Sequence, residues 1–233
     1  MPAKNIIKTY SPNSFYHVYN RGTDKRLVFL DHQDFLTLLS YIKLYLTPSK
    51  KLLRQIQRFK PTSKFTRISA LIKAKNNNYA NKIEVHAYTL MPNHYHLLIK
   101  QKGTYDMAAF IRTIFTCYAY YFNARYKRSG RLFQDNYRAK LIKADRYFSH
   151  LAKYIHLNSQ GLQAKDYPNY RAWRSWEDYP YSSCQYYLSK TNQSFWLTKN
   201  LLNSYLSTTE KHKQFLSENK PAQFEMIKDS ILE

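Results

Sequence analysis

Two histidines flank one tyrosine in the stretch MPNHYHLLIK (residues 91–100), and their types and spacing suit metal chemistry. Alternate residues of a β-strand point to the same face of a sheet, so a strand here would place His94 and His96 side by side. Two imidazoles on one face can bind the same metal ion. Short His-x-His triplets also arise by chance, and most of them bind nothing. From the triplet alone, a ligand pair and two polar residues on an ordinary strand both stay open.

A metal site and a nuclease each need further groups, and the stretch DRYFSHLAKYIHLN (residues 145–158) could supply them. Its pattern predicts a helix with an aspartate at its start. Tyr154 and Asn158 are four residues apart, which places them one turn apart on one helix face. The Asn158 oxygen could complete a His-His-Asn site, and Tyr154 could present its hydroxyl beside a bound phosphate. On helical spacing alone, Tyr154 is better explained as one more core residue among 23 tyrosines.

The elements that must position these residues follow the order β-α-β-β-α-β-α. Residue alternation predicts strands, and apolar spacing of three to four residues predicts helices. The predicted strands are 14–22, 83–90, 94–100 and 131–143, and the predicted helices are 31–46, 106–126 and 145–158. Asp31 is expected to cap the first helix. Four strands with helices packed on one face make an α+β fold of ferredoxin-like type with an antiparallel sheet.

Two segments lie outside this pattern. Residues 47–82 contain ten Lys or Arg and no Asp or Glu, which indicates a basic insertion between two core elements. Beyond residue 160 the pattern weakens to aromatic turns and short helices. We therefore expect residues 1–160 to form the core, with the insertion 47–82, and residues 161–233 to form an appendage docked on it.

The charge balance indicates a polyanionic partner. Thirty-seven Lys and Arg against 15 Asp and Glu give a net charge of +22, and 23 tyrosines and 13 phenylalanines offer surfaces on which bases can stack. An AT-rich genome would explain some of the tyrosines but not the scarcity of acids. No secretion signal or membrane-spanning stretch is visible, and two cysteines make no disulfide framework. A cytoplasmic, nucleoid-associated protein is expected.

The paired stretches MPNHYHLLI and YIHLN resemble the single-tyrosine HUH transposases, most closely the REP-associated branch, which is related to small single-strand insertion-sequence transposases. FYHVYNRG, RSGRLFQDNYRAKLI and DYPYSS occur in family order, so the resemblance covers roughly residues 14 to 190. It implies that His94, His96 and Asn158 hold Mg²⁺ or Mn²⁺ and that Tyr154 is the nucleophile. The implied substrate is single-stranded, hairpin-bearing DNA, cleaved and rejoined through a 5′-phosphotyrosine intermediate. Ser159 departs from the family, which usually has proline there.

Other residues are candidates for DNA contact, although each also fits an ordinary surface role: Asn20, Arg21, Arg131, Tyr137 and Arg138. His17 and His86 are expected to be structural. The three tryptophans are expected to pack the C-terminal segment onto the core.

Two alternatives compete with a strand transferase. A non-catalytic, domesticated protein that recognises folded repeats would share the charge and the aromatic residues, but a degraded copy should have lost at least one of the four site residues. A metal-dependent nuclease that uses water is disfavoured, because the sequence shows no additional Asp/Glu cluster for a two-metal site. The sequence leaves open whether the protein is a monomer or a homodimer.

Overall fold

The computed structural model describes residues 10–57, 65–142, 145–160, 162, 173–189 and 194–218, with the backbone alone at 65–70, 145 and 146. A four-stranded sheet lies at its centre, in the order β2-β3-β1-β4, and all three neighbouring pairs are antiparallel. The strands are β1 (Phe15–Arg21), β2 (Ile83–Met91), β3 (His94–Gln101) and β4 (Arg138–Ile142). This sheet confirms the predicted α+β, ferredoxin-like class.

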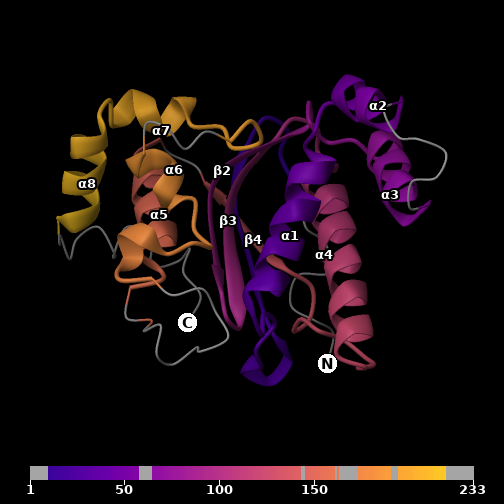
Figure 1. The fold of residues 1–233 in the computed structure, drawn as a ribbon. Helices are drawn as coiled ribbons and strands as arrows, with labels where there is room; N and C mark the ends of the chain where they lie inside the picture. The colour runs from indigo at the N-terminus through magenta and orange to yellow at the C-terminus, as the bar shows by residue number, and fades with distance from the viewer. Residues whose placement is uncertain are drawn as a thin grey trace.

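The helices cover both faces of the sheet rather than one, as Figure 1 shows. α1 (His32–Tyr45) and α4 (Asp106–Arg125) lie together on one face, and α5 (Asp145–Leu157) lies on the other. The prediction of a single covered face was therefore wrong. The strand residues explain why. Both faces of β3 carry buried side chains, so each face needs a cover.

The predicted helices and the hairpin are confirmed, each within a few residues of its predicted ends. Asp31 caps α1, since its carboxylate accepts a hydrogen bond from the Asp34 backbone N–H at 3.2 Å. β2 and β3 form a hairpin in which Met91 pairs with His94. A two-residue turn, Pro92-Asn93, fixes the register and therefore the face on which each histidine lies.

The predicted strand at 131–143 is too long. Only Arg138–Ile142 form β4, and the preceding residues 130–137 form a loop. Asp135 in this loop has a φ of +48°, a left-handed backbone conformation that a strand cannot contain. The loop is held against the end of β1, because the Gln134 N–H donates to the Arg21 carbonyl at 2.7 Å and the Thr23 N–H donates to the Leu132 carbonyl at 3.1 Å.

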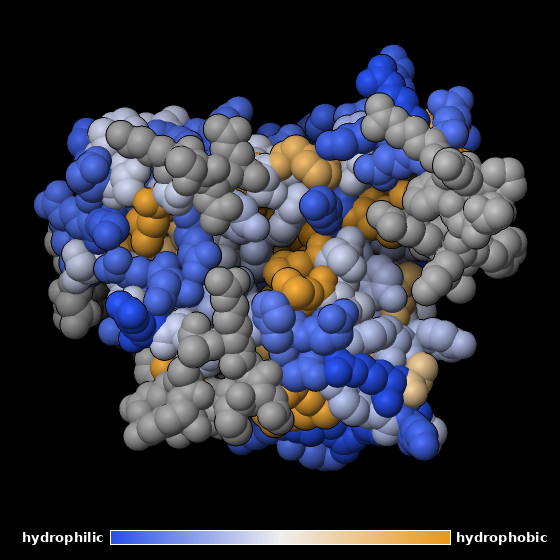
Figure 2. Space-filling view, in the orientation of Figure 1, coloured by the Kyte–Doolittle hydropathy of each residue, from blue (hydrophilic) through white to orange (hydrophobic). Residues whose placement is uncertain are grey.

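The basic segment 47–82 contains two helices, α2 (Ser49–Gln57) and α3 (Phe65–Asn76), while 58–64 lies outside the described residues. Blue, hydrophilic side chains lie at the upper right of Figure 2, where Figure 1 places α2 and α3, and the exposed lysines of these helices include Lys50, Lys51 and Lys73. No helix in the described part of the chain is long and apolar enough to cross a membrane.

C-terminal residues pack against the same sheet. The short elements are η3 (Trp176–Asp178), α6 (Cys184–Leu188), α7 (Asn200–Tyr205) and α8 (Thr209–Ser217). Trp196 stacks on Tyr88 of β2 with ring centroids 5.4 Å apart, and Tyr181 stacks on Phe35 of α1 at 3.7 Å. The division of the chain at residue 160 stays a prediction, and much of 161–172 lies outside the described residues.

Candidate functional site

The register of β1 and β3 places several imidazole side chains on the face of the sheet that α5 covers. Arg21 pairs with His94, and Tyr19 pairs with His96, so these four side chains share one face. Tyr95, between the two histidines, points to the opposite face and stacks on Phe115 of α4, with ring centroids 4.0 Å apart. The alternation predicted from the sequence is confirmed.

α5 packs on the imidazole face through an apolar stripe. Phe148, Leu151, Ala152 and Ile155 are all at most 2% exposed. The ring of Phe148 lies 5.0 Å from that of Phe15 on β1, and the Ile155 carbonyl accepts a hydrogen bond from Thr89 Oγ1 at 2.5 Å. These contacts fix the rotation of α5 about its axis. Tyr154, which lies beside the apolar stripe, therefore faces the histidines.

Tyr154 and Asn158 both reach the imidazole pair. The Tyr154 ring stands edge-on to His96, with centroids 5.5 Å apart, and edge-on to His17 at 6.2 Å. Asn158 Oδ1 lies 3.2 Å from His94 Nε2. The helix and the hairpin thus bring together all four residues that the sequence singled out, although they lie up to 64 positions apart.

A second set of contacts engages the Nδ1 atom of each imidazole ring. His94 Nδ1 lies 2.6 Å from Asn93 Oδ1, and His96 Nδ1 lies 2.9 Å from His17 Nε2. Each Nε2 is therefore left as the nitrogen directed at the site. His96 Nε2 is buried and has no hydrogen-bond partner among the described residues. A buried polar atom in that state suggests a missing ligand.

The donor set fits a divalent cation. Two imidazole nitrogens and one amide oxygen suit divalent metal ions of intermediate softness, such as Mn²⁺. Metal-bound histidines also typically have a hydrogen-bond partner on the second ring nitrogen, as both histidines have here. Within the described residues there is no cluster of three or more His, Cys, Asp or Glu suited to a metal ion, and the Asn158 amide oxygen is the further donor atom that lies beside the imidazole pair.

Burial and neighbouring positive charge keep the two histidines neutral. Burial lowers the pKa of His94 to about 4, and the Arg21 charge acts in the same direction while the Asn158 contact opposes it. Burial, followed by the neighbouring His17 and His94, holds the pKa of His96 well below its usual value. Neutral rings at physiological pH keep the Nε2 lone pairs available for a cation.

His17 and Asn93 are the site residues that the sequence analysis missed. His17 is fully buried and was expected to be structural, but it contacts His96 directly. Strand alternation contained the signal, because His17, Tyr19 and Arg21 lie two residues apart along β1 and must share one face. His86, by contrast, packs between Phe15 and Phe148, away from the site.

The candidate DNA-contacting residues separate onto two faces of the sheet. Arg21 lies beside His94, and Arg138 pairs with Tyr19 on the same face. Asn20, between Tyr19 and Arg21, points to the opposite face. There it lines a large cavity together with Arg131 and Tyr137.

A polar pocket of about 300 Å³ opens beside Tyr19 and Arg21 at the end of β1. Arg138 and Lys25 contribute cations to its lining, and Asp24 and Asp135 contribute carboxylates. Lys25, Asp24 and Asp135 all have positive φ, between 48° and 59°. Aspartate tolerates a left-handed backbone, so the conformational cost at this pocket falls mainly on Lys25. Arg21 Nε is buried here without a hydrogen-bond partner among the described residues.

The chain is similar to a family of known proteins and to a solved structure. Residues 54–158 match the family model described as "Transposase IS200 like", which includes both histidines and ends at Asn158. This match confirms the family resemblance that the motifs indicated. No curated protein matches the chain. A solved structure of a REP-associated tyrosine transposase bound to a REP hairpin is similar with a TM-score of 0.49 and 14% identity, covering 85% of this chain and 93% of that chain.

Proposed function

We propose that this IS200-like transposase is a strand transferase that cleaves and rejoins single-stranded, hairpin-bearing DNA through a covalent bond to Tyr154. The observation that carries the proposal is the contact between Tyr154 and an imidazole pair with an unpaired nitrogen. The Tyr154 ring lies 5.5 Å from His96, whose buried Nε2 has no partner among the described residues. A REP-associated member of the family would act on DNA of this kind.

The ligands of a divalent ion would be His94 Nε2, His96 Nε2 and Asn158 Oδ1. A bound Mg²⁺ or Mn²⁺ would orient the scissile phosphate and stabilise the negative charge that builds on its oxygens. Imidazole donors favour Mn²⁺ over Mg²⁺ in affinity. The role of His17 and Asn93 is to hold each imidazole in the tautomer and orientation that direct Nε2 at the ion.

Tyr154 supplies the nucleophile. Its hydroxyl oxygen attacks the scissile phosphorus, the bond from phosphorus to the 3′ oxygen breaks, and the departing strand leaves as a 3′-hydroxyl. The phosphodiester energy is retained in the phosphotyrosine bond. Attack by a 3′-hydroxyl on that bond restores a phosphodiester and returns the proton to Tyr154, which joins strands.

Neighbouring groups of α5 are engaged elsewhere. His156 Nε2 lies 2.8 Å from Ser183 Oγ, and Lys153 Nζ donates to the Phe215 and Glu218 carbonyls. Arg21 is the cation closest to the histidines in the strand register, and we assign it to the scissile phosphate or the adjacent one.

The test is adduct formation on hairpin DNA. A single-stranded oligonucleotide taken from the repeats that flank the gene carries a label on its 3′ end, because the fragment downstream of the cut keeps the 5′-phosphate that binds tyrosine. The full-length protein is incubated with it and Mn²⁺ or Mg²⁺, and the products are separated on a denaturing protein gel. A labelled, protease-sensitive band is expected from the wild type.

The variants identify the groups responsible. Tyr154→Phe and His94→Ala should abolish the band, whereas Tyr147→Phe, two turns earlier on α5, should retain it. DNA binding without an adduct across several repeats and both metals would favour the non-catalytic binding protein instead. DNA cleavage that survives Tyr154→Phe would contradict the covalent route and favour hydrolysis by water.

A further inference from the structure

A large cavity lies on the face of the sheet opposite Tyr154. It has a volume of about 940 Å³ and is bounded by α4, by the loop 130–137 and by the sheet residues Asn20 and Tyr95. This size is within the range of pockets that bind small organic molecules, roughly 300–1,000 Å³. We call it the α4 pocket. It contains none of the residues assigned to cleavage.

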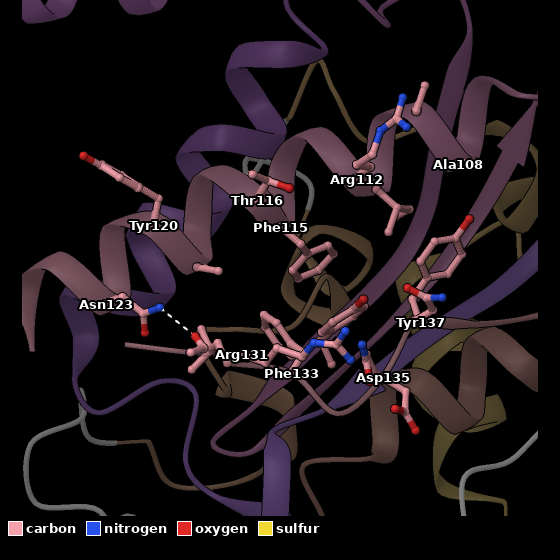
Figure 3. A pocket seen from close by; sticks show the side chains of 18 of the residues that line it. Ala108, Arg112, Phe115, Thr116, Tyr120, Asn123, Arg131, Phe133, Asp135 and Tyr137 are labelled. Carbon is pink, nitrogen blue, oxygen red and sulfur yellow. Dashed lines mark hydrogen bonds between the residues drawn. The ribbon is translucent and has the colours of Figure 1, made fainter. Parts of the chain in front are cut away.

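Aromatic rings form the floor of the α4 pocket. Phe133 of the loop stands edge-on to Phe115 of α4 at 5.3 Å and edge-on to Tyr95 at 5.7 Å. Figure 3 shows Phe115 and Phe133 between the helix and the loop, with Tyr137 beyond them. Tyr105 and Tyr120 beside the α4 wall are 78% and 80% exposed, so their rings are accessible to a ligand.

Polar and cationic groups surround these rings. Arg112 and Arg131 are exposed on the helix wall and the loop, and Asn20, Asn123 and Asn136 contribute amides to the lining. Asp135 is the one carboxylate among the described residues that line it. Flat rings, hydrogen-bonding amides and guanidinium groups together match a nucleobase joined to a phosphate, since bases stack on aromatic rings and arginine binds phosphate.

The loop 130–137 is anchored at both ends by hydrogen bonds, so the shape of the pocket is fixed by the fold. Asn123 Nδ2 donates to the Gly130 carbonyl at 2.9 Å, and Tyr137 shares a hydrogen bond with Tyr10 at 2.9 Å between the hydroxyl oxygens. Gly130 has a φ of +83°, which allows the chain to leave α4 and return over the sheet.

The α4 pocket is continuous with the cleavage face. Asn20, Asp135 and Asn136 line both this cavity and the polar pocket beside Arg21. One extended strand could therefore pass from the histidines, around the end of β1, to the aromatic floor. We propose that the α4 pocket binds an unpaired nucleobase of the same DNA strand that Tyr154 cleaves. This inference rests on the proposed function and adds a base-binding site to it.

A second copy of the chain or an apolar peptide is a poorer occupant. A second copy would bring another surface with a large positive charge against Arg112 and Arg131, since the net charge of the chain is +22. An apolar peptide would bury the two guanidinium groups without a partner. A nucleic acid strand brings the opposite charge.

The experiment uses full-length protein carrying Tyr154→Phe, so that the strand stays intact, and the hairpin oligonucleotides of the adduct assay. Each oligonucleotide has 5-iodouracil at one position in the unpaired segment beside the hairpin. After irradiation, the cross-linked peptide is identified by mass spectrometry. We expect one position to cross-link to Phe133, Tyr137 or Tyr120.

Affinity measurements test the same site without chemistry. Phe133→Ala and Arg131→Ala should each weaken binding about tenfold, within the range for loss of one stacked base, and should remove the cross-link. Thr116→Trp, at an exposed position on the α4 wall, should block the pocket without touching the loop. Arg174→Ala, which removes the same charge from an exposed site elsewhere, should leave affinity nearly unchanged.

The outcomes separate this inference from the proposed function. Affinity unchanged in all three pocket variants, with cross-links only outside the pocket, would overturn the inference even if the wild type forms a Tyr154 adduct. A cross-link in the pocket without any wild-type adduct would support base binding and contradict strand transfer. Concentration-dependent dimerisation lost in Thr116→Trp, with DNA affinity unchanged, would assign the pocket to a second copy and overturn the inference.

Discussion

His17 Nε2 lies 2.9 Å from His96 Nδ1, and the two rings are stacked with centroids 5.1 Å apart. Both side chains are fully buried. The contact fixes the orientation of His96 and leaves its Nε2 directed at the site. A residue on β1 therefore positions a proposed metal ligand on β3, and the pairing of these two strands becomes part of the proposed site.

Removal of His17 should weaken metal binding rather than remove the nucleophile. Contacts that orient metal ligands commonly contribute about 10- to 100-fold to affinity. We expect His17→Ala to raise the Mn²⁺ concentration needed for half-maximal adduct formation by about that factor. His17→Gln, which keeps a hydrogen-bonding group, should recover part of the loss. Calorimetric titration with Mn²⁺ alone measures the same effect without DNA, and unchanged affinity in His17→Ala would contradict this role.

Arg21→Ala should slow adduct formation. A hydrogen bond to a charged group contributes about 1.5–3 kcal/mol, which corresponds to about tenfold to a hundredfold in rate if Arg21 contacts the phosphate in the transition state. Arg21→Lys should retain part of the rate, because it keeps the charge but loses the planar fork. Single-turnover kinetics at saturating DNA separate this effect from weaker binding. An equal loss in Arg174→Ala would show that general charge alone is responsible.

Residue spacing predicted which side chains share a face, and what was missed has physical causes. It placed the two histidines on one strand face and Tyr154 and Asn158 on one helix face, whereas the roles expected of these four residues came from the family resemblance of their motifs. His17 was missed because its contact with His96 depends on which strands are neighbours, and a single sequence does not state the sheet order. The separation of Asn20 from Arg21 did not depend on sheet order: strand alternation alone places these adjacent residues on opposite faces, and the prediction did not apply it to them.

The fold was predicted best where the pattern was strong and local. Residues 131–137 were taken for strand because Leu132, Phe133 and Tyr137 are of the apolar and aromatic types found in strands, and they run directly into the true strand β4. Their aromatic side chains in fact cover the sheet face next to α4, a tertiary arrangement that local pattern does not encode. α5 was not placed on the second face because its apolar stripe fits either side of a sheet.

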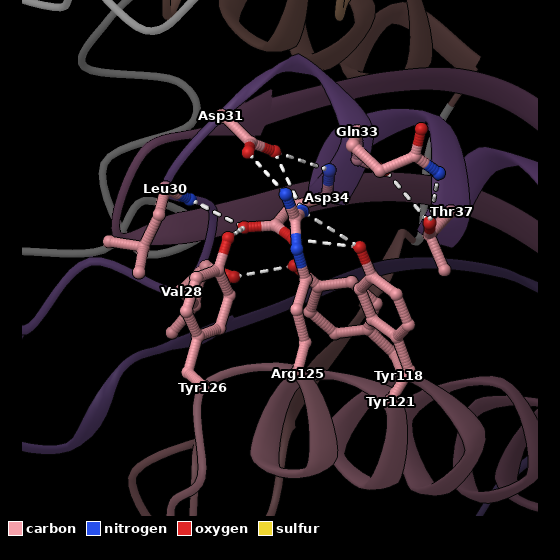
Figure 4. Close-up of polar contacts among 10 residues, drawn as sticks. All are labelled: Val28, Leu30, Asp31, Gln33, Asp34, Thr37, Tyr118, Tyr121, Arg125 and Tyr126. Carbon is pink, nitrogen blue, oxygen red and sulfur yellow. Dashed lines mark hydrogen bonds and ion pairs between the residues drawn. The ribbon is translucent and has the colours of Figure 1, made fainter.

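A buried polar network joins α1 to α4, and its loss should destabilise the fold. Figure 4 shows Arg125 of α4 between Asp31 and Asp34, with N–O distances of 2.6 Å and 2.7 Å. Asp34 is fully buried and also accepts hydrogen bonds from Tyr121 and Tyr126. Asp34 is buried, but the Arg125 and Asp31 side chains are 32% and 29% exposed. Arg125→Ala should therefore cost less than the roughly 3–5 kcal/mol typical of a fully buried pair, about 1–3 kcal/mol.

Urea denaturation measures that change in the free energy of unfolding. Arg112→Ala, at an exposed position on the same helix, is the matched control and should change stability by less than about 0.5 kcal/mol. Equal, small changes in the two variants would contradict a structural role for the network.

Stability should fall as the pH decreases from about 6.5 to about 4, partly through His86. Burial lowers the pKa of His86 to about 4, although the Glu84 carboxylate opposes the shift, and Lys100 acts with burial. Below about 6.5 the unfolded chain binds a proton that the folded chain excludes, so acid favours unfolding across that interval. One such residue contributes up to about 3 kcal/mol.

The measurement compares wild type with His86→Leu by urea denaturation at pH 7 and pH 4.5. Other buried histidines contribute to both proteins, so the difference between the two pH-dependent losses isolates His86. We expect the wild type to lose more stability on acidification than the variant. Identical losses would show that His86 does not titrate differently on folding.

The central proposal is that Tyr154 becomes covalently bonded to the cleaved DNA. The most direct test is mass spectrometry of the wild-type protein after reaction with hairpin DNA and Mn²⁺, followed by nuclease and protease digestion. The account predicts a nucleotide attached through its 5′-phosphate to the peptide that contains Tyr154, and no such mass after reaction of His94→Ala. A nucleotide on a different tyrosine, or cleaved DNA with no modified peptide, would contradict it.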